Sequence, residues 1–260
     1  MPLQLGIGIV TYNRRDLLAE TLDHIARYTK YPFATVAVAD DGSTDGTLDM
    51  LRGRNVTAVT GRNMGVAWNK NRALFLLSEL LRCDIVILLE DDSFPGQDNW
   101  ELEWMNAALH WGHANVATDW MGETFISGSG TLADPVHSTG VSAQCSVYSR
   151  EALLFGGYFD PRFRGYGHEH VEHSYRLARL GYGGAEGPMA DGQRQMLFKL
   201  LRGGIRFATA PSTFDQAQVD RNLALCQELF FDFSYRSPWR DEDEMKQFRE
   251  ELRGVTPRVL

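Results

Sequence analysis

Three acidic residues, Glu90, Asp91 and Asp92, directly follow the most apolar stretch of the chain, residues 85–89. Adjacent carboxylates at the end of a buried strand repel one another, and a divalent cation such as Mg²⁺ or Mn²⁺ offsets that repulsion. Alternate residues of an extended segment point the same way, so Glu90 and Asp92 could face one ion. The sequence therefore predicts a cation site here, with a solvated loop or a helix cap as the alternative.

A second acidic pair, Asp40 and Asp41, follows the apolar run 35–39 and leads into Gly42 and Ser43. A turn followed by a helix N-cap accounts for the serine. It leaves the two adjacent carboxylates unexplained. Because a carboxylate can accept hydrogen bonds from ribose hydroxyls or from the imide of a pyrimidine base, the pair is a candidate nucleotide site.

Basic residues open the helical pattern that begins near residue 66, namely Arg62, Lys70 and Arg72. Helix N-termini and basic side chains favour anionic ligands such as diphosphates. The alternative is a solvated basic face, which suits Arg72 better than Arg62. No predicted strand is followed by the glycine pattern of a dinucleotide-binding site or a P-loop.

The densest group of ionisable residues is the segment 168–173, which reads His-Glu-His-Val-Glu-His. It misses both zinc-protease patterns, because one needs histidine in place of Glu172 and the other in place of Glu169. Histidine and glutamate can instead act as general bases near neutral pH. The alternative is a polar helix start, in which Glu172 pairs with Arg176 four residues later.

The elements that would hold these residues alternate along the first half of the chain. Apolar runs at residues 3–10, 35–39, 56–59 and 84–89 predict strands, and helical patterns separate them. Such alternation favours a parallel sheet, in which ligands bind at the carboxyl ends of the strands. The acidic and basic turns follow these strands, so we expect them at one edge of the sheet. Asn13 is predicted to cap the first helix.

The composition is that of a globular protein, with 260 residues of which 43% are hydrophobic and 23% are charged. The formal net charge of −8 argues against a bulk nucleic-acid partner. Three cysteines without disulfide or metal spacing predict reduced thiols. No signal peptide is evident and no apolar run approaches the ~18 residues that span a bilayer. We therefore expect a cytoplasmic protein without a transmembrane segment, with a peripheral membrane position left open.

Six short segments occur in an order that resembles the family 2 glycosyltransferases of the GT-A (nucleotide-diphospho-sugar transferase) fold. They are residues 9–14, 38–45, 63–67, 88–92, 150–160 and 167–181. Each motif is short, but the six together cover about residues 5 to 185. The resemblance implies an α/β fold with a mixed, mainly parallel sheet flanked by helices.

The resemblance also implies a division of the chain. We expect a GT-A domain over residues 1–210, with a nucleotide-binding half at 1–95 and an acceptor and catalytic half at 96–210. A helical extension is expected at 211–260, and its charged stretch 239–253 is predicted to be a solvated helix.

By this resemblance, the expected reaction is an inverting transfer of sugar from a nucleoside diphosphate sugar, most simply UDP-linked, to an acceptor hydroxyl. A single displacement would take place at the anomeric carbon. The residues that would bind the nucleotide are Thr11, Tyr12, Asn13, Asp40, Asp41, Arg62, Asn63 and Asp91.

The family's Asp-x-Asp triplet corresponds to residues 90–92, so Asp92 would bind Mn²⁺ or Mg²⁺ and Glu90 would contact the ion through water or hold the sugar. The family's Glu-Asp pair corresponds to Glu169 and His170. Glu169 is the preferred base, while His170 is the second candidate and a candidate metal ligand. Other histidines considered as ligands are His168, His173 and His137.

The acceptor, a glycan, a lipid-linked group or a small molecule, would meet the second half of the domain. The candidate contacts are Tyr166, Trp100, His168 and Glu172, whereas Trp104 is expected in the core. Because His170 and Glu90 depart from the family pattern, a non-catalytic nucleotide-sugar or glycan-binding protein is the alternative. A sugar nucleotidyltransferase is disfavoured, since residues 11–15 are not a glycine-rich basic loop.

Overall fold

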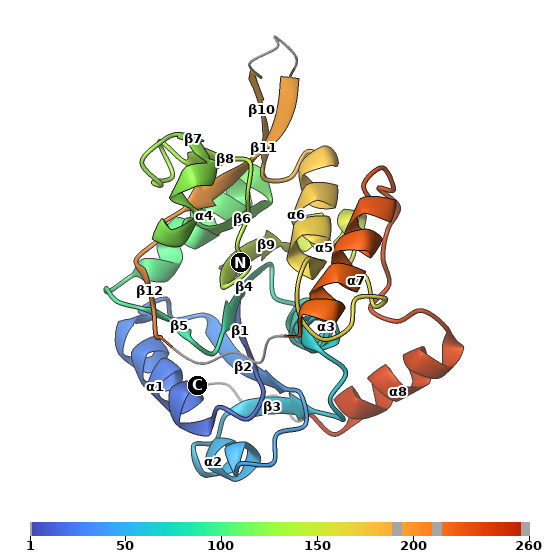
Figure 1. Cartoon of the computed structure of the whole chain (residues 1–260). Helices are drawn as coiled ribbons and strands as arrows, with labels where there is room; N and C mark the ends of the chain where they lie inside the picture. The colour runs from blue at the N-terminus through green and yellow to red at the C-terminus, as the bar shows by residue number, and fades with distance from the viewer. Residues whose placement is uncertain (1, 189–193, 210–214, 256–260) are drawn as a thin grey trace.

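The computed structural model describes residues 2–188, 194–209 and 215–255 (Figure 1). Strands and helices alternate through the first half, as predicted. The strands are β1 (Leu5–Thr11), β2 (Ala34–Asp40), β3 (Thr57–Thr60), β4 (Ile85–Glu90), β5 (Ser93–Pro95), β6 (His113–Val116), β7 (Phe125–Ser127), β8 (Val136–Ser138), β9 (Cys145–Ser149), β10 (Gly184–Pro188), β11 (Arg194–Leu201) and β12 (Ile205–Phe207). The helices are α1 (Arg15–Tyr28), α2 (Thr47–Gly53), α3 (Val66–Phe75), the π-helical η1 (Leu76–Leu80), α4 (Trp100–Trp111), the 3-10 helix η2 (Asp119–Thr124), α5 (Arg150–Gly156), α6 (Glu169–Arg179), α7 (Gln216–Glu228) and α8 (Glu242–Arg253).

One large sheet has the strand order β3-β2-β1-β4-β9-β6-β11-β8-β7, with β10 paired to β11. The first four strands run parallel, and β9 runs antiparallel to β4, so the sheet is mixed as predicted. Thr11 pairs with Asp40, and Val10 pairs with Glu90. The register therefore brings the ends of β1, β2 and β4 to one edge, where the acidic residues were expected.

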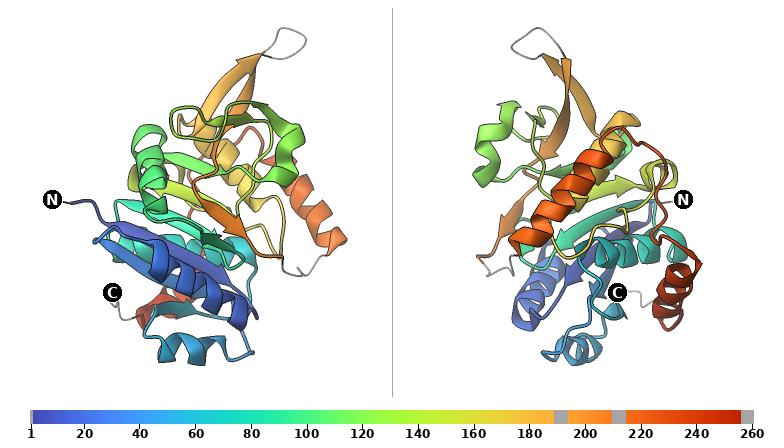
Figure 2. Two further views of the ribbon diagram at one scale, coloured as in Figure 1. Left: turned by 90° about the vertical axis from the view of Figure 1, so that its left-hand side faces the viewer. Right: turned by 45° about the vertical axis from the view of Figure 1, so that its right-hand side comes forward.

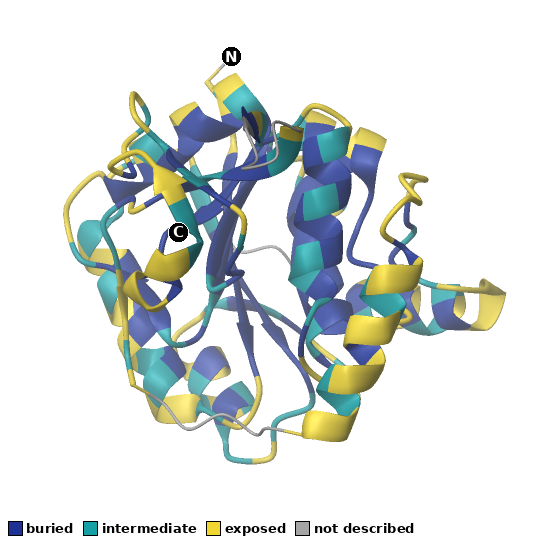
Figure 3. Ribbon diagram, turned by 45° about the horizontal axis from the view of Figure 1, so that its top comes forward, coloured by how far each residue is buried: buried dark blue, intermediate teal, exposed yellow. Residues whose placement is uncertain are grey.

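Helices cover both faces of this sheet (Figure 2). On one face, α1, α2 and α4 contribute to a core that includes Leu22 and Trp104. On the other face, α3, α5, α6 and α8 contribute to a core that includes Trp68 and Leu177. Figure 3 shows the strands as buried and the outward sides of several helices as exposed. Because helices cover both faces of the sheet, both sides of each parallel strand are buried, and this explains why the strands are continuous apolar runs in the sequence.

The C-terminal helices pack on this domain. In α8, Phe248 is fully buried and its ring lies 5.3 Å from that of Trp68. The helix predicted within 239–253 is confirmed at Glu242–Arg253, but it is solvated on one side only, because Phe248 and Leu252, four residues apart, form a buried apolar side. The predicted boundary at residue 210 falls at 210–214, outside the described residues.

Polar contacts also join α8 to α3. The Glu251 carboxylate accepts hydrogen bonds of 3.0 Å from the Trp68 indole and 3.0 Å from the Arg72 guanidinium. Arg72 is fully buried, so its expected place on a solvated basic face is wrong. A buried charge needs partners: Asp41 provides one carboxylate at 2.7 Å, and α8 provides a second from 179 residues further along the chain.

We expect Glu251→Gln to lower the free energy of unfolding by about 1–2 kcal/mol, because the amide keeps the size of the side chain but loses the charge that faces Arg72. Chemical denaturation measures this change. Glu250→Gln, at an exposed position on the same helix, is the matched control and should change the free energy by less than about 0.5 kcal/mol. Equal effects of the two variants would contradict the structural role of Glu251.

All three cysteines, Cys83, Cys145 and Cys226, are free thiols. Among the described residues, none of the helices combines the length and apolar character needed to cross a bilayer.

Candidate active site

The middle residue of the acidic triplet, Asp91, is buried and held inside the protein. Its carboxylate accepts hydrogen bonds from the Thr11 hydroxyl at 2.7 Å and from Arg14 at 2.9 Å. Burial raises the pKa of Asp91 to about 6, although Thr11 and Arg14 oppose the shift. Thr11 and Asp91, both predicted to bind nucleotide, thus join the end of β1 to the end of β4.

The outer residues of the triplet face the solvent. The side chain of Glu90 is 26% exposed and that of Asp92 is 15% exposed, which is the alternation expected of an extended segment. Burial and the nearby Glu90 raise the pKa of Asp92, so the two carboxylates lie close enough to interact. Arg14 lies 3.2 Å from Asp92.

A fully buried lysine connects the triplet to the second acidic motif. The Nζ atom of Lys70, on α3, lies 2.9 Å from Glu90 and 3.2 Å from Glu169. Burial alone would lower the pKa of Lys70, but attraction to these two carboxylates outweighs it and raises that pKa above the usual lysine range. Lys70 is therefore a permanent positive charge between them.

In the sequence alone, Lys70 is one of several basic residues that favour an anionic ligand. One signal could have identified its role. The residues three and four positions from Lys70 on the helix, Ala67, Ala73 and Leu74 among them, are apolar. A lysine on an apolar side of a helix is expected to be buried, so it must find an internal carboxylate.

The two residues predicted as candidates for the general base, Glu169 and His170, are the first two residues of α6. Glu169 is only 2% exposed, and although burial would raise its pKa, Lys70 and His170 hold that pKa well below the usual carboxyl range. The side chain of His170 is 20% exposed, and its Nδ1 lies 3.3 Å from a Glu169 oxygen. The histidine is thus the more accessible member of the pair, and the glutamate orients it.

Tyr166 is exposed on the loop that precedes α6. Asn222 of α7 donates a hydrogen bond of 3.0 Å to the Tyr166 carbonyl, and the Val66 amide donates one of 3.0 Å to Gly165. Gly65 has a φ of +93°, and a Cβ there would lie 2.5 Å from the Gly165 nitrogen. Only glycine therefore lets this loop pack against the start of α3.

The Tyr166 hydroxyl belongs to the same electrostatic cluster. Burial raises its pKa, and so do the carboxylates of Glu90 and Glu169. His168 precedes α6 in a left-handed conformation with φ 65°, and burial followed by His170 lowers its pKa. Two of the four predicted acceptor contacts, Tyr166 and His168, thus lie in the loop that leads directly into the predicted catalytic pair.

Asp40 is buried and shapes the turn after β2. Its carboxylate accepts a hydrogen bond of 2.7 Å from the Thr60 hydroxyl and longer ones from the amides of Gly42 and Ser43. These contacts fix the backbone of the predicted nucleotide turn. The side chain itself is directed into the protein.

Asp41 organises a second turn, the one before α3. It accepts hydrogen bonds from the amides of Met64 at 3.0 Å and Gly65 at 2.9 Å, and from Arg72 at 2.7 Å. Burial raises the pKa of Asp41, although these donors oppose the shift. Asp40 and Asp41, at the end of β2, therefore both position turns. From the sequence alone, this role could not be distinguished from direct contact with a nucleotide.

Four other predicted nucleotide contacts lie around these turns. Tyr12, Arg62 and Asn63 are exposed, and Arg62 donates a hydrogen bond of 2.9 Å to Gln247 of α8. Asn13 does not cap α1: its carboxamide instead accepts from the Thr44 amide at 2.7 Å. The prediction of Asn13 as a helix cap is wrong, because its side-chain oxygen instead accepts from the Thr44 amide, which lies in a turn 31 residues further along the chain.

Trp100 is not available to a sugar. It is buried in the core, and its indole donates a hydrogen bond of 3.1 Å to the Thr29 hydroxyl. Trp100 lies four residues before Trp104, which is buried as predicted and donates to the Gly203 carbonyl at 3.0 Å. The two rings share the apolar side of α4, so the proposed sugar contact of Trp100 is corrected to a core role.

Two other candidates are excluded by burial. Glu172 pairs with Arg176 at 2.8 Å, so the alternative interpretation of this residue is confirmed and its acceptor role is wrong. His173 is fully buried and its Nε2 lies 2.9 Å from the Gly157 carbonyl, so it cannot serve as a metal ligand of the triplet. His137 lies on β8, which is four strands away from β4 in the sheet.

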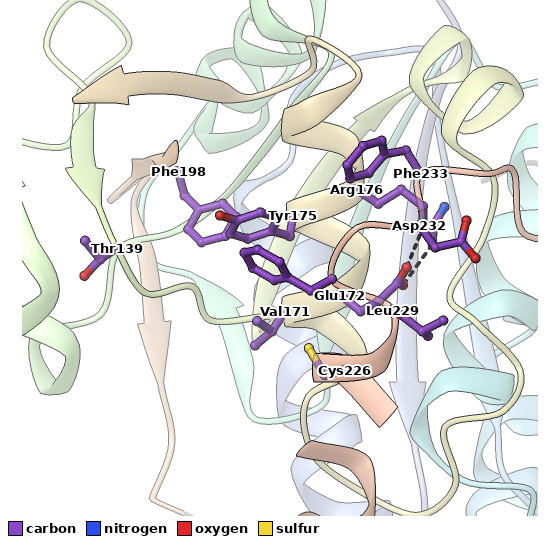
Figure 4. Close-up of a pocket in the computed structure, with 11 residues that line it drawn as sticks. Thr139, Val171, Glu172, Tyr175, Arg176, Phe198, Cys226, Leu229, Asp232 and Phe233 are labelled. Atoms are coloured by element: carbon purple, nitrogen blue, oxygen red, sulfur yellow. Dashed lines mark hydrogen bonds and ion pairs between the residues drawn. The ribbon is translucent and has the colours of Figure 1, made fainter. Parts of the chain in front are cut away.

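A cavity of about 120 Å³ lies between α6, α7 and β11 (Figure 4). The Glu172–Arg176 pair forms part of its wall. The other residues that line it are Thr139, Val171, Tyr175, Phe198, Cys226, Leu229, Phe230, Asp232 and Phe233. None of these belongs to the triplet or to the Glu169–His170 pair, so the cavity is separate from the predicted chemistry.

The donor set fits a cation that shares its ligands with a phosphate. Within the described ranges, no three His, Cys, Asp or Glu side chains gather to bind a metal. Glu90 and Asp92 are partly exposed oxygen donors, and Mg²⁺ is usually bound by one or two carboxylates plus substrate phosphates. The cluster also has more acidic than basic side chains: Glu90, Asp91, Asp92 and Glu169 against Lys70 and Arg14.

Residues 7–153 match the family described as Glycosyl transferase family 2, a span of more than half of the chain. A search of curated proteins found no match.

Solved structures share the predicted GT-A fold. The mannosyltransferase PcManGT from Pyrobaculum calidifontis, in complex with GDP-Man and Mn²⁺, is 19% identical with a TM-score of 0.56, over 70% of this chain and 54% of its own. GalNAc-T7 with UDP, GalNAc and Mn²⁺ is 15% identical with a TM-score of 0.63, over 96% and 54%. S. aureus TarS is 17% identical with a TM-score of 0.56, over 89% and 44%. The chain spans about half the length of these proteins, and at such identities the likeness shows the fold.

Proposed function

The chain belongs to glycosyl transferase family 2, and on that basis we propose that it is a metal-dependent inverting enzyme that moves a sugar from a nucleoside diphosphate sugar to an acceptor hydroxyl. The observation that carries the proposal is the cluster at the end of β4. There, Glu90 and Asp92 face the solvent beside Lys70 and the Glu169–His170 pair.

Glu90 and Asp92 would hold Mn²⁺ or Mg²⁺ against the diphosphate of the donor. When bound, the ion supplies positive charge that stabilises the departing diphosphate. Two similar structures were solved with Mn²⁺, which supports this assignment. UDP is the proposed nucleotide because the family resemblance implies it, and the similar structure of GalNAc-T7 was solved with UDP.

The nucleotide would lie over the turns that Asp40 and Asp41 shape. Tyr12, Arg62 and Asn63 are exposed there and are the proposed direct contacts. The predicted residues whose side chains already hold the turns and strand ends would act indirectly by fixing the backbone; they are Thr11, Asn13, Asp40, Asp41 and Asp91.

His170 is the proposed general base, in place of Glu169. If its Nδ1–H donates to the Glu169 carboxylate, its Nε2 is the nitrogen that accepts a proton. The acceptor hydroxyl would transfer its proton to Nε2 while its oxygen bonds to the anomeric carbon and the bond to the diphosphate oxygen breaks. Glu169 is a poor base because Lys70 stabilises its charged form. One displacement inverts the anomeric configuration, which NMR of the product can read.

Because the ion and the diphosphate share ligands, we expect UDP and Mn²⁺ together to raise the melting temperature far more than either alone. At a ligand concentration of 100 times its dissociation constant, stabilisation reaches about 2.7 kcal/mol. Asp92→Asn should remove the metal-dependent part of the shift. Asp98→Asn, an exposed residue that pairs with Lys30, is the matched control.

An equal shift for Asp92→Asn and the wild type would remove Asp92 from the metal site. A shift with GDP in place of UDP would change the proposed nucleotide. If donors bind but no sugar donor releases its nucleoside diphosphate with any acceptor, the alternative of a non-catalytic nucleotide-sugar-binding protein is favoured.

A further inference from the structure

Trp120, on η2, exposes an aromatic ring to water. It is 73% exposed, whereas Trp68, Trp100 and Trp104 are buried. Its neighbours Asp119 and Glu123 on the same short helix are also exposed, so the ring is not part of an extended apolar patch of the kind that binds a protein. A single large aromatic ring among polar residues is better suited to a small amphipathic partner.

Hydrogen bonds tie this ring to the catalytic cluster. The Trp120 indole donates to the Gln144 side chain at 3.4 Å, and the Ser142 hydroxyl donates to the same oxygen at 3.4 Å. The backbone carbonyl of Gln144 accepts a hydrogen bond of 3.0 Å from the Glu90 amide. The polar edge of the indole is therefore held one residue away from Glu90, and most of the ring remains accessible.

The chemistry of the ring indicates its partner. The face of an aromatic ring carries partial negative charge, and a pyranose presents a flat array of weakly positive C–H groups that can stack on it. The rim of such a sugar needs hydrogen-bond partners, which Gln144 and the neighbouring carboxylates provide. Tyr166, a second exposed aromatic residue, lies three positions before Glu169, which shares Lys70 with Glu90.

We propose that Trp120 is the stacking platform of the acceptor subsite and that the acceptor is a saccharide. This inference rests on the proposed glycosyl transfer and names the substrate class of the same site. Gln144 is a positioning residue for the indole.

Binding of saccharides tests the inference without turnover. The probes are methyl glycosides and disaccharides of glucose, galactose, mannose and N-acetylglucosamine, titrated in the presence of UDP and Mn²⁺. Intrinsic fluorescence is a suitable readout, because three of the six tryptophans are buried and the exposed Trp120 should respond most. We expect at least one probe to bind the wild type and to bind Trp120→Ala about tenfold more weakly. Trp120→Phe should retain most of the affinity.

Phe231→Ala, at a ring that is 78% exposed after α7, is the matched control and should bind like the wild type. The variants that lack Trp120 also lack the fluorescent reporter, so their saccharide binding is compared with that of the wild type by saturation-transfer NMR of the same probes. Equal affinity of Trp120→Ala and the wild type, or no binding of any saccharide by the wild type, would overturn the inference. The proposed function is tested by a separate measurement: it fails if UDP and Mn²⁺ together do not raise the melting temperature.

Discussion

Lys70→Met should lower the free energy of unfolding by about 3–5 kcal/mol and abolish turnover. The Glu169 carboxylate is almost fully buried, and Lys70 is its nearest cation, at 3.2 Å. Removing one partner of a buried ion pair leaves an uncompensated charge in a medium that solvates it poorly. The same change would release His170 from a fixed orientation, since Glu169 would need to protonate or move.

The double variant Lys70→Met/Glu169→Gln separates loss of charge balance from loss of packing. Replacing both charges should recover a large part of the stability that Lys70→Met loses, because no buried charge then remains unpaired. Lys246→Met, at an exposed lysine on α8, is the matched control. Chemical denaturation of the wild type, Lys70→Met, Glu169→Gln and the double variant measures the coupling. If the double variant were less stable than Lys70→Met by the full cost of Glu169→Gln, the ion pair would not be the cause.

The pH dependence of this loss has a definite sign. The folded pKa of Glu169 is depressed, so its contribution to stability is present above the unfolded pKa of about 4.3 and is lost as the pH falls below it. The folded pKa of Lys70 is raised, so its contribution is present below about 10.4 and is lost at higher pH. The difference in stability between wild type and Lys70→Met should therefore be larger at pH 7 than at pH 4.

His170→Ala should lower kcat by about 10²–10⁴-fold, the usual contribution of a general base. Binding of UDP and Mn²⁺ should stay at the wild-type level, because the imidazole acts on the acceptor. Added imidazole should restore part of the rate to this variant. His110→Ala, an exposed histidine on α4, is the control for losing an imidazole elsewhere.

A wild-type rate in His170→Ala would return the role of base to Glu169. Loss of metal-dependent UDP binding in the same variant would instead indicate that His170 is a metal ligand, as the sequence also allowed.

The sequence predicted the alternating strands and the positions of their ends well, because both depend on local patterns. The apolar runs before Asp40 and Glu90 are long enough to specify buried strands, and the ends of parallel strands meet at one edge. The alternation of Glu90 and Asp92 around Asp91 follows from extended geometry alone. These features needed no knowledge of distant residues.

Partners far apart in the chain could not be predicted in this way. Arg72 reads as a surface residue until Glu251, 179 positions later, is known to face it. Lys70 finds Glu169 across 99 positions. A residue type fixes what a side chain can bind, but only tertiary packing decides whether the partner comes from the protein or from a substrate, which is why the core position of Trp100 and the turn contacts of Asp41 were not predicted.

The docking of α8 on α3 limits how this protein can be recombined with its relatives. The segment that carries the family signature ends about a hundred residues before Glu251, yet Arg72 within it depends on that glutamate. A chimera that exchanges the donor-binding half would have to transfer residues 242–253 together with residues 66–75. Such swaps designed from the signature alone would keep the Asp41 partner of Arg72 but lose its second carboxylate partner, Glu251.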